Sequence, residues 1–175
     1  MDGIIFPLAT LLKPEDVHPS QHRALVDQMI SLVSRLHTKK IIHGDIKPPN
    51  FLHCSGDQLR LWDFSEGLRF DEDLSNWNGM TTANYISPHR TRLWPGSASE
   101  PPQTIEDDLY GLGVSIWELY TGKVPFDGWY EDGILWALQR GETVNVNEIK
   151  DEEVKAVICE YLRIGGCKGL ISDCI

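Results

Sequence analysis

One stretch of the chain brings together side chains that could bind a metal ion and a phosphate. Within residues 41–66, Asp45, Lys47 and Asn50 lie on a short polar segment, and Asp63 follows an apolar run. Carboxylate and amide oxygens are hard ligands suited to Mg²⁺, which keeps several waters and shares phosphate oxygens. A lysine ammonium can meet a phosphate as a point charge, and an aspartate can accept a proton from a hydroxyl group. The residue types therefore indicate a site for a metal ion and a phosphate.

The residues around this polar segment predict how it is held. Residues 41–42 are β-branched isoleucines followed by His43 and Gly44, which predicts a short buried strand that runs into a turn. Residues 48–49 are both prolines, so we expect no helix across the loop and an extended backbone at Lys47. The polar side chains would then lie on irregular backbone, where catalytic groups are common.

A hairpin is predicted directly after the loop. Two short apolar runs, residues 51–52 and 59–62, are separated by residues 54–57, whose composition is typical of a turn. Such a hairpin would return Asp63 to the side of Asn50. The amide oxygen and the carboxylate would then converge on one cation.

The combined pattern resembles two motifs of the eukaryotic-type protein kinases. Residues 43–50 read His-Gly-Asp-Ile-Lys-Pro-Pro-Asn, and residues 63–65 read Asp-Phe-Ser. In that family a catalytic aspartate is followed by lysine two residues on and by asparagine five residues on, and then by Asp-Phe-Gly. The first segment is thus similar to the catalytic loop, and the second is similar to the metal-binding motif.

The resemblance implies a role for each of these residues. Asp45, Lys47 and Asn50 would be catalytic, and Asn50 and Asp63 would bind the metal. ATP and Mg²⁺ are the implied cofactors. The implied reaction is Ser/Thr-type phosphoryl transfer from ATP to a protein substrate that carries a Ser or Thr hydroxyl group.

Three further residues gain a role from the same resemblance. Residues 63–89 correspond to the activation segment, in which Thr82 matches the threonine that bonds the catalytic aspartate and lysine. His43 opens the catalytic motif as structural support, and Asp108 matches the aspartate that anchors the catalytic-loop backbone. A second interpretation of Asp108 stays open, because a helix dipole favours any carboxylate in the first turn.

Departures from the family pattern keep two alternatives open. Gly44 replaces the arginine that receives an activation-loop phosphate in many kinases, Ser65 replaces a glycine, and His89 replaces a glutamate. One alternative is a non-catalytic, pseudokinase-like module that binds a protein partner. The other is a small-molecule kinase of the aminoglycoside and choline type, whose catalytic loop also reads His-Gly-Asp.

Apolar periodicity predicts most of the other elements as helices. One helix is expected from Ser20, a buried central helix over about residues 106–120, and two more at residues 129–140 and 150–164. The first carries a core stripe at four positions: Leu25, Met29, Leu32 and Leu36. Gly165 and the glycine after it are expected to end the last helix.

The remaining segments read as connections. Residues 3–12 favour a strand or a short helix, the polar stretch after Asp63 reads as a loop, and residues 92–105 read as a surface loop. The expected fold is mainly α with a small β-hairpin. Residues 1–175 would form one partial kinase-like domain, the large C-terminal lobe without the β-rich small lobe.

The segment that precedes the catalytic loop in the sequence lacks the motifs with which a kinase binds ATP. Those motifs are a glycine-rich loop, a strand lysine and a helix glutamate, all upstream of the loop. No glycine-rich motif precedes Asp45, and Lys13, followed by Pro14, is a poor match for the strand lysine. We therefore expect a truncated kinase domain with no small-lobe ATP-binding lysine, which leaves an active and an inactive lone chain both open.

Composition limits the class of protein. The chain has 175 residues, 41% hydrophobic and 24% charged, as expected for one soluble globular domain. A net charge of −10 argues against nucleic-acid binding, and no apolar run is long enough to span a membrane. The 4 cysteines show no zinc-ligand spacing, so we expect reduced thiols in an intracellular protein, cytoplasmic or nuclear.

Overall fold

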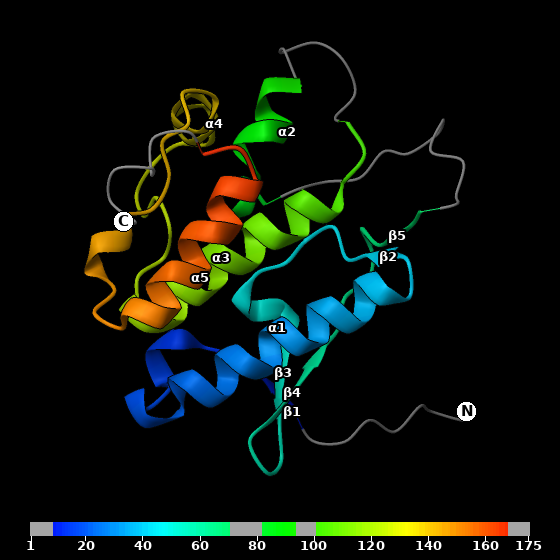
Figure 1. The fold of residues 1–175 in the computed structure, drawn as a ribbon, viewed down its shortest axis with the longest axis vertical. Helices are drawn as coiled ribbons and strands as arrows, with labels where there is room; N and C mark the ends of the chain where they lie inside the picture. The colour runs from blue at the N-terminus through cyan, green and yellow to red at the C-terminus, as the bar shows by residue number, and fades with distance from the viewer. Residues whose placement is uncertain (1–8, 71–81, 94–100, 168–175) are drawn as a thin grey trace.

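The chain is organised around a buried central helix. The computed structural model describes residues 9–70, 82–93 and 101–167, and helix α3, Ile105–Thr121, lies at the centre of these residues (Figure 1). Its N-terminus is closed by a capping box, in which Thr104 accepts a hydrogen bond from the Asp107 amide and Asp107 accepts one from the Thr104 amide at 2.8 Å. Apolar side chains cover most of its circumference, so the predicted central helix is buried as expected.

Two long helices flank α3. Helix α1 spans His22–Thr38 and α5 spans Glu152–Ile164, and α5 runs alongside α3 (Figure 1). Both helices lie where the apolar periodicity predicts them. In the α1 stripe, Leu25 and Met29 are buried in the core. The other two stripe residues, Leu32 and Leu36, are only partly buried, because they line an open groove, although Leu32 also packs against the core.

The strands form two small antiparallel sheets. The first has the order β1-β3-β4, with β1 at Ala9–Leu11, β3 at Phe51–Cys54 and β4 at Gln58–Leu61. The hairpin between β3 and β4 is the one the sequence predicts, and Phe51 pairs with Leu61. The second sheet pairs β2, Ile41–Ile42, with β5. Of the predicted strand or helix at residues 3–12, residues 3–8 lie outside the described part.

Three local predictions are wrong. Within the predicted loop after Asp63, β5 forms at Leu68–Arg69, because β2 offers it a pairing partner that local sequence does not reveal. Helix α2 forms at Pro88–Leu93, where proline fits the first turn, so residues 92–93 of the expected loop 92–105 are helical; residues 94–100 lie outside the described part, and residues 101–104 form no helix or strand, as predicted. A single 3-10 turn spans Pro48–Asn50, since prolines are tolerated at its first two positions.

The C-terminal part adds α4, Glu131–Gln139, which packs against α2.

Cys54 and Cys167 are free, whereas Cys159 is disulfide-bonded. The expectation of reduced thiols is therefore wrong for Cys159, whose sulfur forms a bond to another sulfur. Among the described residues, no helix has both the length and the apolar character needed to cross a membrane.

Candidate active site

The backbone of the loop at residues 43–50 is hydrogen-bonded to α3. The amides of His43 and Gly44 donate hydrogen bonds of 2.8 Å to separate carboxylate oxygens of Asp108. Asp108 is 1% exposed, and its Oδ2 also lies 2.8 Å from Nε2 of His37. A buried carboxylate needs such partners to offset its loss of hydration. His37 was not predicted, since nothing in its sequence spacing links the end of α1 to α3.

His43 joins the loop to the end of the hairpin. Its Nε2 lies 2.9 Å from the carbonyl oxygen of Trp62, and its Nδ1 accepts a hydrogen bond of 3.4 Å from the Asp45 amide. The tautomer with hydrogen on Nε2 satisfies both contacts. The ring also packs against that of Phe64, with centroids 4.8 Å apart. The fully buried imidazole thus couples residues 43–50 to residues 62–64.

Two glycines permit the close approaches around the loop. Gly44 has φ of +83°, and a Cβ there would collide with the backbone carbonyl of Glu66. A Cβ at Gly111 on α3 would lie 2.7 Å from the carbonyl oxygen of Ile46. The first departure from the family motif therefore has a local physical reason, because an arginine at position 44 would need this backbone to shift.

Four of the sequence-predicted residues meet in one polar cluster. Lys47 Nζ lies 2.6 Å from Asp45 Oδ2, and Asn50 Nδ2 donates to the same oxygen at 3.0 Å. The Thr82 hydroxyl donates to Asp45 Oδ1 at 3.0 Å and accepts from Lys47 Nζ at 2.7 Å. Hydrogen bonds to both carboxylate oxygens fix the orientation of the Asp45 side chain. The cluster places an aspartate, a lysine and a threonine within direct contact across 37 residues of sequence.

The local backbone explains how Asn50 enters this cluster. Lys47 is extended, with φ of −157° and ψ of 160°, as the following proline predicts. The 3-10 turn then directs Asn50 inward, where it is 3% exposed and donates a further hydrogen bond of 2.7 Å to the Asp45 carbonyl. The turn thereby closes the catalytic loop on itself.

Asp63 follows directly on the hairpin strand that returns to Asn50. The Trp62 amide donates to the Asn50 carbonyl at 3.2 Å, and the Trp62 indole donates to the Pro49 carbonyl at 2.8 Å. Asp63 is exposed and has a positive φ of 56°, which is uncommon outside glycine. Hydrogen bonds from Ser65 lower the pKa of Asp63 below its usual value, and the nearby charge of Lys47 acts in the same direction.

The chemistry of the donor atoms fits Mg²⁺. Since Asn50 Nδ2 is committed to Asp45, the atom that Asn50 can offer a cation is its amide oxygen. Asp63 offers an exposed, ionised carboxylate. Within the described ranges, no group of three or more His, Cys, Asp or Glu side chains could hold a metal ion. A cation would thus keep waters or phosphate oxygens in its shell, which is how Mg²⁺ is usually bound.

The segment that carries Thr82 is attached to α3 by two hydrogen-bonded pairs. The Tyr85 hydroxyl donates to Glu118 at 2.5 Å, and the Ser87 hydroxyl donates to Asp107. Burial raises the pKa of Glu118 to about 7, although the hydrogen bond from Tyr85 opposes this shift. Glu118 was not predicted as a site residue, because its place on an apolar helix gives no sign of a distant partner.

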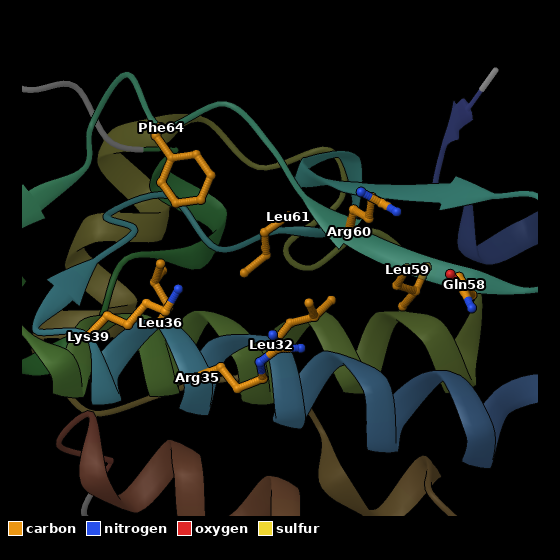
Figure 2. Close-up of a pocket in the computed structure, with 9 residues that line it drawn as sticks. All are labelled: Leu32, Arg35, Leu36, Lys39, Gln58, Leu59, Arg60, Leu61 and Phe64. Atoms are coloured by element: carbon orange, nitrogen blue, oxygen red, sulfur yellow. The ribbon is translucent and has the colours of Figure 1, made fainter. Parts of the chain in front are cut away.

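An open groove lies on the other side of the metal-binding motif. Figure 2 shows Leu32 and Leu36 on α1 pointing toward Leu61 on β4, with Phe64 at one end. The groove has a volume of about 510 Å³. Phe64 is 46% exposed, which is high for a phenylalanine that also packs on a buried histidine. Three basic residues, Arg35, Lys39 and Arg60, also line this groove.

Comparisons with known proteins match most of the chain to one family. The family model for the protein kinase domain matches residues 6–174. The serine/threonine-protein kinase PrkC of Bacillus subtilis is 30% identical over 114 residues, which cover 64% of this chain and 16% of PrkC. The probable serine/threonine-protein kinase PknB of Lactococcus lactis is 33% identical over 106 residues, which cover 59% of this chain and 16% of PknB.

A human protein gives a similar match. Mitogen-activated protein kinase kinase kinase 13 is 29% identical over 119 residues, which cover 66% of this chain and 12% of the human protein. The chain therefore matches less than a fifth of the length of each of these curated relatives.

Proposed function

The chain belongs to the protein kinase domain family, and from this premise we propose that it carries the catalytic and metal-binding half of a Ser/Thr-type site that transfers phosphate from ATP to a protein hydroxyl. The observation that supports this most strongly is the closed cluster of Asp45, Lys47, Asn50 and Thr82. Asp45, Lys47 and Asn50 come from one short loop, and Thr82 joins them from a segment 37 residues further along the chain.

Each residue has a role that follows from its contacts. Asp45, oriented by its neighbours, accepts the proton of the substrate hydroxyl group. Lys47 places its charge beside that carboxylate, where the transferred phosphate would lie. Asn50 and Asp63 would hold Mg²⁺, which when bound neutralises charge on the phosphate oxygens. Thr82 hydrogen-bonds to both Lys47 and Asp45 and so keeps their side chains next to each other.

The groove beside Phe64 supports a second part of the proposal. Its apolar walls would be covered when a nucleotide-gripping lobe sits above α1 and β4. Such a lobe would bring the ATP-binding lysine. Phosphoryl transfer then depends on this association.

The same groove favours the alternative of a non-catalytic module that binds a protein partner. Both uses would bury the exposed ring of Phe64. They differ in nucleotide binding, because a binding module does not need to hold Mg²⁺ and ATP.

The small-molecule kinase has less support. It was suggested by Gly44, and the backbone at that position accounts for the glycine without reference to the substrate. The contacts of Thr82 with Lys47 and Asp45 belong instead to the protein-kinase pattern that the sequence predicts.

Thermal shift with Mg²⁺ and ATP, combined with identification of the phosphate acceptor, separates these functions. For the longest in-frame protein that contains the chain, the proposal predicts that Mg²⁺ and ATP raise the melting temperature, that Asp63→Asn removes the shift, and that labelled phosphate appears on Ser or Thr of proteins. Capture of a protein partner without any nucleotide-dependent shift would favour the binding module. Labelling confined to aminated sugars or alcohols would favour the small-molecule kinase.

A further inference from the structure

A second surface hollow lies at the start of α4, away from the proposed reaction. It has a volume of about 630 Å³ and is lined by Gly128, Trp129, Tyr130, Asp132 and Gly133. Tyr130 is 90% exposed and Trp129 is 53% exposed. Two large aromatic side chains that remain this accessible on adjacent residues are unusual for a surface without a binding role.

The Trp129 ring, one wall of this pocket, packs against two neighbouring residues. The Trp129 ring packs edge-on against Phe126, with centroids 5.9 Å apart, and lies against the Cα of Gly133, where a Cβ would be 3.6 Å away. Phe126 has a positive φ of 54°, a genuine outlier for a bulky residue. Such strained backbone is often found at binding sites. The Trp129 side of the pocket is therefore held in place, whereas the Tyr130 ring, at 90% exposure, would be ordered on binding.

Unpaired negative charge surrounds the aromatic rings. Asp127, Glu131 and Asp132 are all exposed. None of the three forms an ion pair or a side-chain hydrogen bond with another residue in the described part of the chain. The pocket wall thus carries the Asp132 carboxylate, and Asp127 and Glu131 lie next to lining residues in the sequence, all three without a positive partner among the described residues.

The basic side chains closest in sequence are already engaged. Lys123 lies 2.5 Å from Glu148. Arg140 stacks over the Trp136 ring at 4.3 Å and pairs with Glu142 at 2.9 Å. Neither is free to neutralise the pocket, so its charge is available to a ligand from outside.

We propose that this pocket is a docking site for a lysine or arginine side chain carried by an exposed segment of a partner protein. Aromatic faces attract a cation, and the Asp132 carboxylate of the pocket wall complements its charge. The net charge of −10 also attracts basic segments and disfavours acidic ones. This site would bind whether or not the chain transfers phosphate.

The pocket is connected to the segment that carries Thr82. Asn84 donates a hydrogen bond of 2.6 Å from its amide to the Pro125 carbonyl, at the start of the loop that supports Trp129. Helix α4 also packs against the turn Ala83–Tyr85. A docked basic segment would therefore lie next to the activation segment, within reach of a substrate that is held at both places.

Fluorescence anisotropy with a defined peptide tests the site directly. The probe is a fluorescein-labelled peptide of alternating arginine and glycine, and its control replaces every arginine by glutamine. The proposal predicts that the arginine peptide binds and that added salt weakens this binding, because the charges are exposed. The glutamine peptide is expected not to bind.

Matched variants locate the binding. Tyr130→Ala and Asp132→Asn are each expected to weaken binding about two- to five-fold, the usual size of one exposed cation–π contact or ion pair. Phe70→Ala controls for the loss of an exposed aromatic residue outside the pocket. Glu152→Gln controls for an exposed acid in the first turn of another helix. Neither control should change the affinity, and circular dichroism verifies that each variant is folded.

Three results would overturn the proposal. Equal affinity of Asp132→Asn and wild type, or an equal loss with Glu152→Gln, would mean that binding reflects net charge alone. Equal binding of the glutamine peptide would mean that the cation is not recognised. Self-association of the chain that disappears in Tyr130→Ala would identify the pocket as an interface between two copies.

Discussion

The carboxylate of Asp108 accepts hydrogen bonds from two successive amides of the catalytic loop and contacts His37. A carboxylate that only complemented the helix dipole would not need these three partners, so Asp108 has a further role. The capping of α3 is carried out by Thr104 and Asp107 instead. Asp108 is thus the link through which the buried core fixes the geometry of the active-site loop.

Replacing Asp108 by asparagine should destabilise the protein. An amide has one acceptor oxygen, so one loop amide would face an NH₂ group and remain without a partner. We expect Asp108→Asn to lower the free energy of unfolding by about 2 to 4 kcal/mol. Urea denaturation measures this change, with Glu106→Gln as the control for loss of an exposed carboxylate on the same helix. A change below about 0.5 kcal/mol would be typical of an ordinary surface site.

Gly44 offers a test of how tightly the loop is packed. Gly44 and Gly56 both have positive φ, 83° and 77°, but only a Cβ at Gly44 would strike a neighbour. Both alanine variants bear the strain of positive φ, about 1 to 2 kcal/mol. Gly44→Ala should cost at least about 1 kcal/mol more, which thermal or urea unfolding can measure. Equal losses in the two variants would show that Glu66 moves aside without cost.

At the scale of elements, the Tyr85–Glu118 hydrogen bond attaches the Thr82 segment to α3. Burial raises the pKa of Glu118 from 4.5 to about 7 in the folded chain. Between these values the folded state binds a proton that the unfolded state has released. The contribution of Glu118 to stability is therefore fully present below about pH 4.5 and is lost as the pH rises through about 7.

This linkage predicts a difference between wild type and Glu118→Gln. Glutamine still accepts the Tyr85 hydrogen bond but does not titrate. From pH 5 to pH 7.5 the wild type should lose about 2 kcal/mol of stability relative to the variant, as measured by urea unfolding at each pH. Parallel pH profiles of the two proteins would contradict the burial-induced pKa shift.

Sequence patterns predict best those helices and strands whose formation is determined by the residues within them. The apolar periodicity predicts α1, α3 and α5, since each buries a regular stripe, and turn residues predict the hairpin of β3 and β4. The strand β5 could not be found in this way. Its two residues gain their structure only by pairing with β2, which lies far from them in the sequence.

The site residues also divide into those that local sequence predicts and those that it does not. Fixed spacing within residues 43–50 predicts which side chains form the polar cluster, and the resemblance adds Thr82. His37 and Glu118 were not predicted, because their partners are brought to them by the packing of helices around α3. The exposed pocket at α4 also lacks a sequence signal, since accessibility is a property of the assembled chain.

At the scale of the whole molecule, Phe51 and Phe64 should differ in how much each contributes to the free energy of unfolding. Phe51 is 0% exposed in the core, whereas Phe64 is 46% exposed at the end of the groove. Phe51→Ala should lower the free energy of unfolding by about 3 to 5 kcal/mol. Phe64→Ala should cost under half of that, because its ring is only partly removed from water.

The comparison is made by urea denaturation of the two variants and the wild type. If Phe64→Ala were as destabilising as Phe51→Ala, Phe64 would belong to the core. The groove would then have no apolar ring to offer an added lobe or a partner.

The most direct test of the proposed function is the rate of phosphate transfer from labelled ATP to protein Ser and Thr residues in the presence of Mg²⁺. It compares wild type with Asp45→Asn in the longest in-frame protein that contains the chain. Because loss of a general base typically costs about 10² to 10⁴ in rate, we expect Asp45→Asn to slow labelling by at least about 100-fold at a temperature where circular dichroism shows the variant to be folded. Labelling at the wild-type rate by Asp45→Asn, or no labelling by either protein, would contradict the assignment of this loop to phosphoryl transfer.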